Sequence, residues 1–267
     1  MEKLEKLLET IRSYGSLAVA FSGGVDSSVL TKAAALALDG RAAAVTAVSE
    51  LLPEQELGDA RRIAVLAGIR HEIIEARDLD STELVRNDKE RCYYCKKRRF
   101  RMLCDWAAAN GYAFVADGSN LDDQGDYRPG MKAIAELAPK VVSPFVVCGW
   151  TKQDIRRQAK DWNLPVWDKP SAACLASRVE YGIALTAERL QQVEAAEEML
   201  KKYLSGQLRV RHHGSLARIE LEQKDMEAFW QHREELTGAI KETGFTYVTL
   251  DLEGYRMGSQ NEVLQKK

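Results

Sequence analysis

The stretch of this 267-residue chain that decides its fold is Ser22-Gly23-Gly24-Val25-Asp26-Ser27-Ser28. It directly follows the apolar run LAVAF at 17–21, which predicts a short buried strand, and it leads into 27–38, whose apolar residues recur at helical spacing. Two adjacent glycines let the backbone bend so that successive N–H groups point at one spot, and the start of a helix adds its dipole there. The stretch therefore predicts a phosphate-binding loop between a strand and a helix.

The side chains of this loop suit phosphate and a metal ion. The hydroxyls of Ser22, Ser27 and Ser28 are donors for phosphate oxygens. Asp26 suits Mg²⁺, which prefers one or two carboxylates together with substrate phosphates. The alternative is a tight turn whose Asp and Ser cap the helix, but two glycines and four hydroxyl or carboxylate residues exceed what a cap needs. The pattern is neither the Walker loop nor G-x-G-x-x-G.

Strand-like and helix-like segments alternate around this loop as far as about residue 160. The expected strands are 17–21, 42–48, 71–75, 112–116 and 140–142. The expected helices are 1–15, 27–38, 53–67, 91–110 and 151–162. Such alternation with short links predicts an α/β fold with a doubly wound parallel sheet, whose ligands bind at the carboxyl ends of the strands.

The pattern changes after this region. Residues 163–182 are rich in Pro, Ser and Ala without periodicity, which predicts a long functional loop. From Thr186 a helix, strands at 208–211 and 216–221, a further helix and a strand at 246–250 follow. We therefore expect one domain at 1–182, which includes the loop at 163–182, and a small α+β domain at 183–267.

Composition places the chain among globular proteins of ordinary charge. Hydrophobic residues make up 45% and charged residues 29%, and the formal net charge is −2, so no global basic field indicates nucleic acid or an anionic membrane. The N-terminus is amphipathic and no apolar run approaches the ~20 residues that span a bilayer. We expect a cytoplasmic protein, where five cysteines indicate catalysis, a metal or core packing more readily than disulfides.

A second polar stretch follows the expected strand at 112–116. It begins Asp117-Gly118-Ser119-Asn120 and continues to Asp126-Tyr127-Arg128-Pro129-Gly130. Its position at a strand's carboxyl end puts polar groups where a nucleotide would lie, although the same residue types also form solvated turns. We expect Arg128, held between a tyrosine and a rigid Pro-Gly bend, to contact an anionic group of a nucleotide or substrate.

Four motifs together resemble a known family. They are SGGVDSS at 22–28, RCYYCK at 91–96, DGSN with DYRPG at 117–130, and KPSAACLASR with YG at 169–182. The first is similar to the PP-loop of the N-type ATP pyrophosphatases, which adenylate their substrates and whose fold is a doubly wound parallel sheet. The set resembles the ATP-dependent sacrificial sulfur transferases of lactate racemase maturation, which make the organic part of the nickel-pincer nucleotide cofactor.

The resemblance implies a substrate, cofactors and site residues. The substrate is pyridinium-3,5-biscarboxylic acid mononucleotide, and the cofactors are ATP and Mg²⁺. The enzyme adenylates a carboxylate, Cys174 attacks it, and cleavage of the cysteine's Cβ–S bond leaves a thiocarboxylate on the product and dehydroalanine in the protein. The loop at 22–28, with Asp117, Gly118 and Asn120, would bind ATP, and Lys96 and Arg128 would bind the substrate.

Cys174 is the candidate sulfur-handling residue. An acyl-adenylate turns a poor leaving oxygen into AMP, so that a thiolate can attack the carbonyl. Neighbouring Lys169 and Arg178, which are also candidates for substrate binding, would favour the thiolate. A small buried apolar residue is the alternative for a lone cysteine, but a cation-flanked loop without periodicity favours a reactive thiol.

Two further cysteines leave the source of the sulfur open. Cys92 and Cys95 share one helix face, and with Cys174 they make a three-thiolate [4Fe–4S] cluster an alternative to a sacrificed cysteine. Cys104 lies about half a turn round from Cys95, so we assign it to packing, as we do Cys148 in VVCGW. Zinc would want a fourth ligand and is a weaker interpretation.

Basic residues recur in the C-terminal domain. Arg209 and Arg211 share one face of a strand, and Glu220 lies on the next. They are candidates to grip the substrate's phosphate, although ordinary exposed sheet residues give the same spacing. The family resemblance implies that this domain helps to build the substrate site and the interface of a homo-oligomer, a hexamer in relatives.

Three other functions compete with this reading. A tRNA thiolase of the same superfamily would use the basic run at 96–101, which a solvated helix face explains equally well; net charge −2 and no RNA-binding module favour a small molecule. An amidotransferase-type synthetase would need a glutaminase domain or a bound ammonia source. A regulatory module that only binds ATP would need neither Asp26 nor Cys174.

Overall fold

The computed structural model describes residues 2–125, 129–170 and 173–265, which form two compact units. The first unit comprises residues 1–77 and 92–172, and the second comprises residues 78–91 and 173–267. Each unit has its own sheet. No helix in the described ranges is both long and apolar enough to cross a bilayer.

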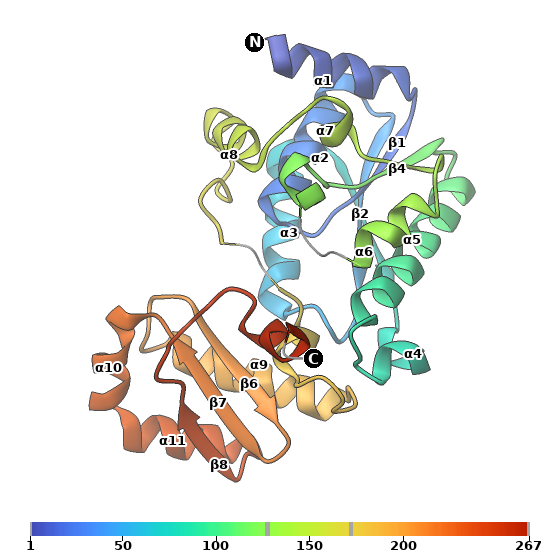
Figure 1. Ribbon diagram of the computed structural model, residues 1–267. Helices are drawn as coiled ribbons and strands as arrows, with labels where there is room; N and C mark the ends of the chain where they lie inside the picture. The colour runs from blue at the N-terminus through green and yellow to red at the C-terminus, as the bar shows by residue number, and fades with distance from the viewer. Residues whose placement is uncertain (1, 126–128, 171–172, 266–267) are drawn as a thin grey trace. The chain divides into compact units, whose positions relative to one another are not determined.

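The first unit is built on a five-stranded sheet in the order β3-β2-β1-β4-β5, and all neighbouring strands pair in parallel (Figure 1). Its strands are β1 (Leu17–Ala20), β2 (Ala42–Val48), β3 (Arg70–Glu75), β4 (Phe114–Ala116) and β5 (Val141–Val142). The chain adds β2 and β3 on one side of β1, then β4 and β5 on the other. This reversal confirms the predicted doubly wound fold and places a switch point between β1 and β4.

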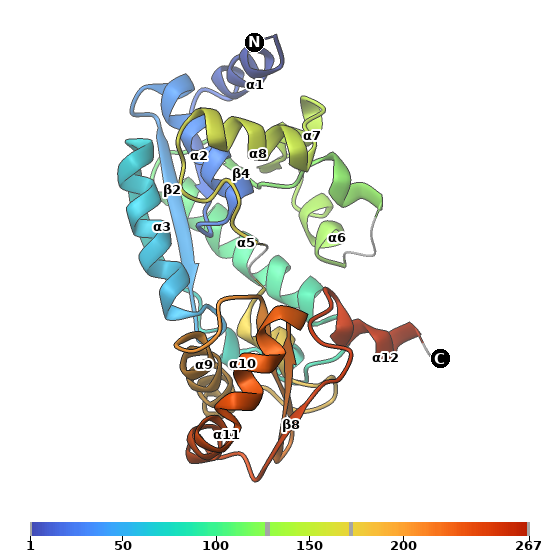
Figure 2. The same cartoon turned by 90° about the vertical axis from the view of Figure 1, so that its left-hand side faces the viewer.

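Helices cover both faces of this sheet (Figures 1 and 2). They are α1 (Glu2–Ser13), α2 (Val25–Leu38), α3 (Glu54–Ala67), α5 (Arg91–Ala109), α6 (Pro129–Ala135), α7 (Pro144–Val147) and α8 (Lys152–Asp161). Leu17 and Val19 of β1 pack with α1, α2, α3 and α8, whereas Ala18 packs with α5 on the opposite face. Because both faces are buried, β1 is apolar throughout and shows no polar alternation.

The second unit is an α+β layer around a three-stranded sheet in the order β6-β7-β8. Its strands are β6 (Leu208–His213), β7 (Leu216–Leu221) and β8 (Tyr247–Leu250), with β6 antiparallel and β8 parallel to β7. Its main helices are α9 (Ala187–Lys201), α10 (Met226–Gln231), α11 (Arg233–Glu242) and α12 (Glu262–Gln265). The apolar side of α9, with Leu190, Val193 and Leu200, is buried, as the predicted α+β pattern requires.

The expected elements occur with ends shifted by no more than two residues. The helices expected from 151 and 186 begin one residue later, because Thr151 and Thr186 are N-cap residues whose hydroxyls accept hydrogen bonds from the first turn. The stretch at 163–182, expected to be an irregular loop, contains a short 3₁₀ helix, η3 (Leu175–Arg178), immediately after Cys174.

Residues 78–91 belong with the second unit because a buried asparagine binds them to it. The Asn87 amide nitrogen donates to the carbonyl oxygens of Glu180 and Ile183, both at 2.9 Å, and to that of Val179 at 3.3 Å. Its oxygen accepts from the Arg91 guanidinium, which also donates to the Ala176 carbonyl at 2.7 Å. This segment, which includes α4 (Thr82–Val85), therefore supports the chain that follows Cys174.

Replacement of Asn87 by alanine should destabilise the protein strongly. The substitution removes the hydrogen bonds of Asn87 to three carbonyl oxygens and to Arg91, and we expect this loss to cost on the order of 3 kcal/mol in the free energy of unfolding. The measurement is urea-induced unfolding followed by circular dichroism.

Asn163→Ala is the matched control. Asn163 also has a left-handed backbone, with φ 52° against 53° for Asn87, and no side-chain hydrogen bond to a described residue. It should lose only the ~1 kcal/mol that a left-handed alanine costs. An equal loss for both variants would show that the hydrogen bonds of Asn87 contribute nothing.

Candidate active site

The predicted phosphate loop lies at the carboxyl end of β1, where helix α2 begins. Gly24 is the N-cap of α2, with φ −77° and ψ 163°, and no side chain of the described residues caps this helix start. The first N–H groups of α2 therefore point out of the loop without a side-chain acceptor. This is the arrangement that binds phosphate at helix N-termini.

Two glycines allow neighbouring segments to approach the loop closely. Gly23 has φ +74°, and a Cβ there would lie 3.2 Å from the backbone of Ala60 in α3. A Cβ on Gly118, just beyond β4, would lie 3.2 Å from the Asp26 Cβ and 3.3 Å from the Ser27 nitrogen. The loop is therefore backed by α3 and pressed against the end of β4, so its shape is set by the surrounding structure.

The three loop serines differ in what they can offer a ligand. The hydroxyls of Ser27 and Ser28 both donate to the Gly24 carbonyl, at 3.1 and 2.8 Å, and both side chains are buried. Ser22 is exposed, and its hydroxyl lies 3.2 Å from that of Ser27. Ser27 and Ser28 thus brace the loop, while Ser22 is the serine whose hydroxyl is open to a ligand.

The carboxylate of Asp26 receives partners from two distant segments. The Asn120 amide nitrogen donates to Asp26 Oδ1 at 3.3 Å, and the Lys152 ammonium forms an ion pair with Oδ2. The side chains of Asp26 and Lys152 remain 27% and 33% exposed. A partly exposed carboxylate on a phosphate loop fits Mg²⁺, and Asp26 is the residue that would hold it.

Lys152 is a site residue that the sequence reasoning missed. It is the first residue of α8, and the capping box of Thr151 and Asp154 fixes its position. Burial raises the pKa of Asp154, but hydrogen bonds from Lys3 and Thr151 outweigh burial and lower that pKa to about 2. The available signal was the T-x-x-D string at 151–154, which predicts a helix start.

The segment after β4 is held by Asp117. Its carboxylate, almost fully buried, accepts hydrogen bonds from the hydroxyls of Ser119 and Ser143 and lies 3.8 Å from the Lys96 ammonium. Asp117 therefore joins the ends of β4 and β5 to α5. Lys96, expected to bind substrate, lies in this same cluster of the first unit.

Lys169 is neutralised within the first unit. Its ammonium lies 2.9 Å from Glu56 Oε2 and 2.7 Å from Asp59 Oδ2, both on α3. Burial lowers the pKa of Lys169, but the hydrogen bonds to these carboxylates outweigh it and raise that pKa. Lys169 therefore ties the start of the cysteine segment to the helix that backs the phosphate loop.

Cys174 lies in the second unit, half-buried at the start of η3. Its carbonyl oxygen accepts hydrogen bonds from the Ser177 hydroxyl at 2.7 Å and from Arg178 Nη1 at 3.0 Å. Arg178 is buried and makes two hydrogen bonds to Glu197, at 2.9 and 3.0 Å. Burial lowers the pKa of Arg178, but the charge of Glu197 outweighs it and raises that pKa. Arg178, expected to bind substrate, here shapes the turn that carries the cysteine.

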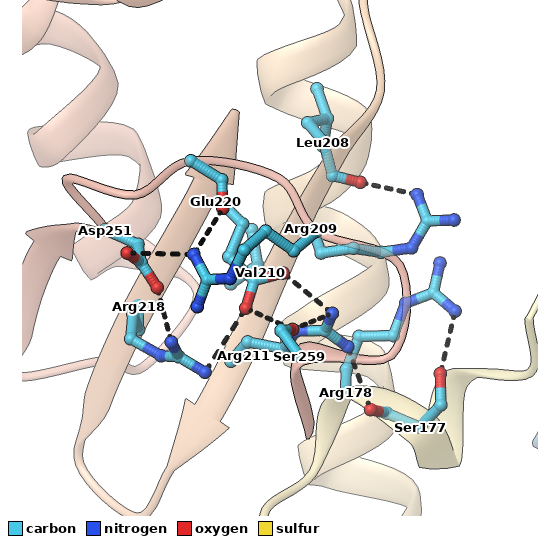
Figure 3. A network of polar contacts seen from close by, with 12 residues as sticks. Ser177, Arg178, Leu208, Arg209, Val210, Arg211, Arg218, Glu220, Asp251 and Ser259 are labelled. Carbon is cyan, nitrogen blue, oxygen red and sulfur yellow. Dashed lines mark hydrogen bonds and ion pairs between the residues drawn. The ribbon is translucent and has the colours of Figure 1, made fainter. Parts of the chain in front are cut away.

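The three C-terminal candidates divide into a neutralised pair and a separate arginine (Figure 3). The buried Arg211 donates to Glu220 at 2.7 Å, to the Ser259 hydroxyl at 2.9 Å and to the Ser177 carbonyl at 3.0 Å. Its Nε has no hydrogen-bond partner among the described residues. Arg211 and Glu220 thus compensate each other and support the turn after Cys174.

Arg209 differs from Arg211 in forming no ion pair with a carboxylate of the described residues, although the charge of Glu197 attracts it from a longer distance. Its guanidinium lies 5.2 Å from the Tyr255 ring centroid and donates to the Leu208 carbonyl at 2.6 Å. Burial, and then the charge of Arg178, lower the pKa of Arg209. A bound anion would compensate both the burial of the Arg209 charge and its repulsion by Arg178. Of the three C-terminal candidates, Arg209 is therefore the cation best suited to a phosphate.

The remaining cysteines occupy different surroundings. Cys92 is exposed and Cys95 is half-buried on α5 in the first unit, whereas Cys174 belongs to the second. The described residues include no group of three or more His, Cys, Asp or Glu side chains that could hold a metal ion. Cys148 is in the core and burial raises the pKa of Cys104, in agreement with their assignment to packing. Arg128 lies outside the described residues.

Comparisons with known proteins extend across both units. The asparagine synthase family model matches residues 4–88. An uncharacterized protein of Synechocystis is 41% identical over 269 residues, which cover 98% of this chain and 100% of that protein. The pyridinium-3,5-bisthiocarboxylic acid mononucleotide synthase of Lactiplantibacillus plantarum is 35% identical over 268 residues, which cover 99% of this chain and 95% of that one. An uncharacterized protein of Methanocaldococcus jannaschii is 31% identical over 259 residues, covering 96% and 98%.

The contact between Gly23 and Ala60 makes the loop sensitive to a single methyl group. Gly23→Ala should weaken ATP binding by on the order of tenfold, equivalent to ~1.4 kcal/mol, because the loop must shift away from α3. Isothermal titration calorimetry with ATP measures this effect, and thermal melts report stability.

Gly40→Ala separates the contact from backbone strain. Gly40 has φ +81°, but a Cβ there meets nothing within 4 Å. Both variants should lose stability from the left-handed backbone, and Gly40→Ala should bind ATP normally. Unchanged ATP affinity in Gly23→Ala would remove this loop from the nucleotide site.

Proposed function

The chain belongs to the family of ATP-dependent sulfur transferases of lactate racemase maturation, since it is 35% identical over 268 residues to the pyridinium-3,5-bisthiocarboxylic acid mononucleotide synthase, and we propose that it performs the reaction of that family. It adenylates a carboxylate of pyridinium-3,5-biscarboxylic acid mononucleotide with ATP and replaces the activated oxygen by sulfur. The products are AMP, pyrophosphate and the thiocarboxylate used for the nickel-pincer nucleotide.

The observation that carries the ATP-dependent half of this proposal is the loop at the β1–β4 switch point. There Asn120, from the segment after β4, donates to Asp26 at the uncapped start of α2. The loop N–H groups and the Ser22 hydroxyl bind the phosphates, and Asp26 holds Mg²⁺. An ion held there would supply positive charge to the phosphates and so make pyrophosphate a better leaving group.

The second half-reaction uses Cys174. Its thiolate attacks the acyl-adenylate and expels AMP, which leaves a thioester between substrate and protein. Loss of the cysteine's Cα proton then forms the Cα–Cβ double bond, and the electron pair of the broken Cβ–S bond stays on the departing thiocarboxylate. The hydrogen bonds of Ser177 and Arg178 to the Cys174 carbonyl support this role because they fix the turn that presents the thiol. A [4Fe–4S] cluster on Cys92, Cys95 and Cys174 is the alternative sulfur source.

In this proposal, residues of the second unit bind the substrate. Arg209 binds the phosphate of the mononucleotide, and the pair of Arg211 and Glu220 holds Arg209's surroundings and the cysteine turn in place. Lys96 and Arg128 contribute further positive charge to nucleotide or substrate. By family resemblance, the protein works as a homo-oligomer.

Asp26→Asn should abolish adenylation and leave the fold intact. The amide keeps the shape of the side chain but removes the charge that holds Mg²⁺, so ATP–pyrophosphate exchange should slow by on the order of a hundredfold or more, at ~1.4 kcal/mol per factor of ten. Exposed Asp105 on α5 provides the control Asp105→Asn, which should exchange normally. An active, normally melting Asp26→Asn would exclude Asp26 from the site.

Cys174→Ala should separate activation from sulfur transfer. The variant should still release pyrophosphate with substrate but form no thiocarboxylate, and Cys104→Ala should do both. Wild-type protein should transfer one sulfur per chain, and intact-mass analysis should find it lighter by one H₂S at residue 174.

A cluster mechanism predicts different results in the same experiments. Iron and sulfide should then be present in anaerobically purified protein, and replacement of Cys92, Cys95 or Cys174 should bleach the cluster. Turnover with added sulfide should be multiple, and Cys174 should keep its mass. A Cys174→Ala variant that transfers sulfur normally would contradict both mechanisms.

A further inference from the structure

A lysine from outside the phosphate loop lies on the loop's carboxylate. The Lys152 ammonium contacts Asp26 Oδ2, while Asn120 donates to Oδ1, so both oxygens of Asp26 are engaged. Both members of the ion pair are about one-third exposed or less, which leaves them open to an incoming ligand. The pair spans 126 residues of sequence and joins α8 to the start of α2.

The main chain at Lys152 is fixed, whereas its side chain has freedom to move. The Lys152 N–H donates to Asp122 Oδ2 at 2.7 Å, and the capping box of Thr151 and Asp154 holds the first turn of α8. The Leu121 N–H donates to the Trp150 carbonyl at 2.9 Å, which fastens the segment after β4 to the same turn. A rigid base with a flexible four-carbon stem lets the ammonium exchange partners without any backbone movement.

Stability alone is a weak explanation for this ion pair, because partly exposed salt bridges contribute little to it. The charges give a stronger one. Without Lys152, Asp26 would present a single negative charge in a loop shaped to receive phosphates, and it would repel ATP. A magnesium ion and an ammonium group are both drawn to the Asp26 carboxylate, and an ammonium on Oδ2 would compete with the ion for it.

We propose that Lys152 is a nucleotide-binding residue that exchanges partners: its ammonium holds the cation position on Asp26 in the empty site and moves to the phosphates when magnesium-bound ATP enters. The inference rests on the proposed function in that it takes the loop as the ATP site. An ammonium group serves as a mobile point charge for phosphate, and α8 keeps it within reach. Lys152 thus neutralises Asp26 before binding and the phosphates after it.

This exchange predicts two changes of opposite sign in one variant. Lys152→Met keeps the length of the side chain and removes the charge. The competitor for Asp26 is then gone, so a divalent cation alone should bind more tightly. The phosphate contact is gone as well, so nucleotide should bind more weakly. A lysine that only stabilised the fold would produce neither effect beyond a shift in melting temperature.

The test uses full-length protein and two titrations. Electron paramagnetic resonance follows Mn²⁺ binding without nucleotide, since Mn²⁺ takes the same oxygen ligands as Mg²⁺. Calorimetry follows a non-hydrolysable ATP analogue, methylene-bridged between the α- and β-phosphates, at saturating Mg²⁺. In Lys152→Met we expect the Mn²⁺ dissociation constant to fall about threefold or more and that of the analogue to rise about tenfold, which corresponds to ~1.4 kcal/mol.

Three further variants complete the test. Lys152→Arg keeps the charge and should restore wild-type Mn²⁺ binding and most of the analogue affinity. Asp26→Asn combined with Lys152→Met should lose the tighter Mn²⁺ binding. Lys160→Met removes a lysine of the same helix that lies over the Trp167 ring, and it should change neither constant.

Unchanged or weaker Mn²⁺ binding in Lys152→Met, or unchanged analogue affinity, would overturn the proposal. Failure of the proposed function gives a different result: wild-type protein would form no acyl-adenylate with the mononucleotide. Both titrations would still show whether Lys152 and a divalent cation compete for Asp26.

Discussion

The close approach of β4's end to the phosphate loop holds the candidate nucleotide site together. Strands β1 and β4 pair in parallel, with Leu17 opposite Phe114, so their carboxyl ends reach the same edge of the sheet. Gly118 then lies so close to Asp26 that a Cβ on it would be only 3.2 Å from the Asp26 Cβ. This contact brings Asn120 to the Asp26 carboxylate, and the hydrogen bond of Asp122 to the Lys152 N–H adds the start of α8. Three segments far apart in sequence thereby surround one carboxylate.

In the second unit, two buried ion pairs fix the conformation of the chain around Cys174. Arg178 with Glu197, and Arg211 with Glu220, are almost fully removed from solvent. Such pairs are weak evidence for stability, because removing two charges from water costs about as much as their attraction returns. Here Arg178 also donates to the carbonyl oxygen of Cys174. Arg211 donates to the carbonyl oxygen of Ser177 (Figure 3). Their consequence is a defined conformation for the chain that carries the thiol.

Sequence predicted correctly those features that depend on neighbouring residues in the chain. The phosphate loop follows from two glycines between an apolar strand and a helix, and β1 is apolar because both its faces are covered. The roles of the charged residues were harder to predict. Arg178 and Lys169 were expected near substrate because they flank Cys174. In the structure, Arg178 forms an ion pair with Glu197 and donates to the turn, and Lys169 forms ion pairs with Glu56 and Asp59. For Lys152 the sequence predicted only a position at the start of a helix, next to the capping residue Thr151.

Local sequence thus specifies the order of strands and helices and the phosphate loop, because backbone bends, hydrophobic periodicity and caps depend on neighbouring residues. The family follows from the resemblance of four short motifs, which are also local. The partner of each charge is a matter of tertiary contacts. Lys169 meets Asp59 across 110 residues and Lys152 meets Asp26 across 126, and no local pattern encodes such pairs. Only the folded chain therefore separates the arginines that pair with buried carboxylates, such as Arg178 and Arg211, from Arg209, which forms no such ion pair among the described residues.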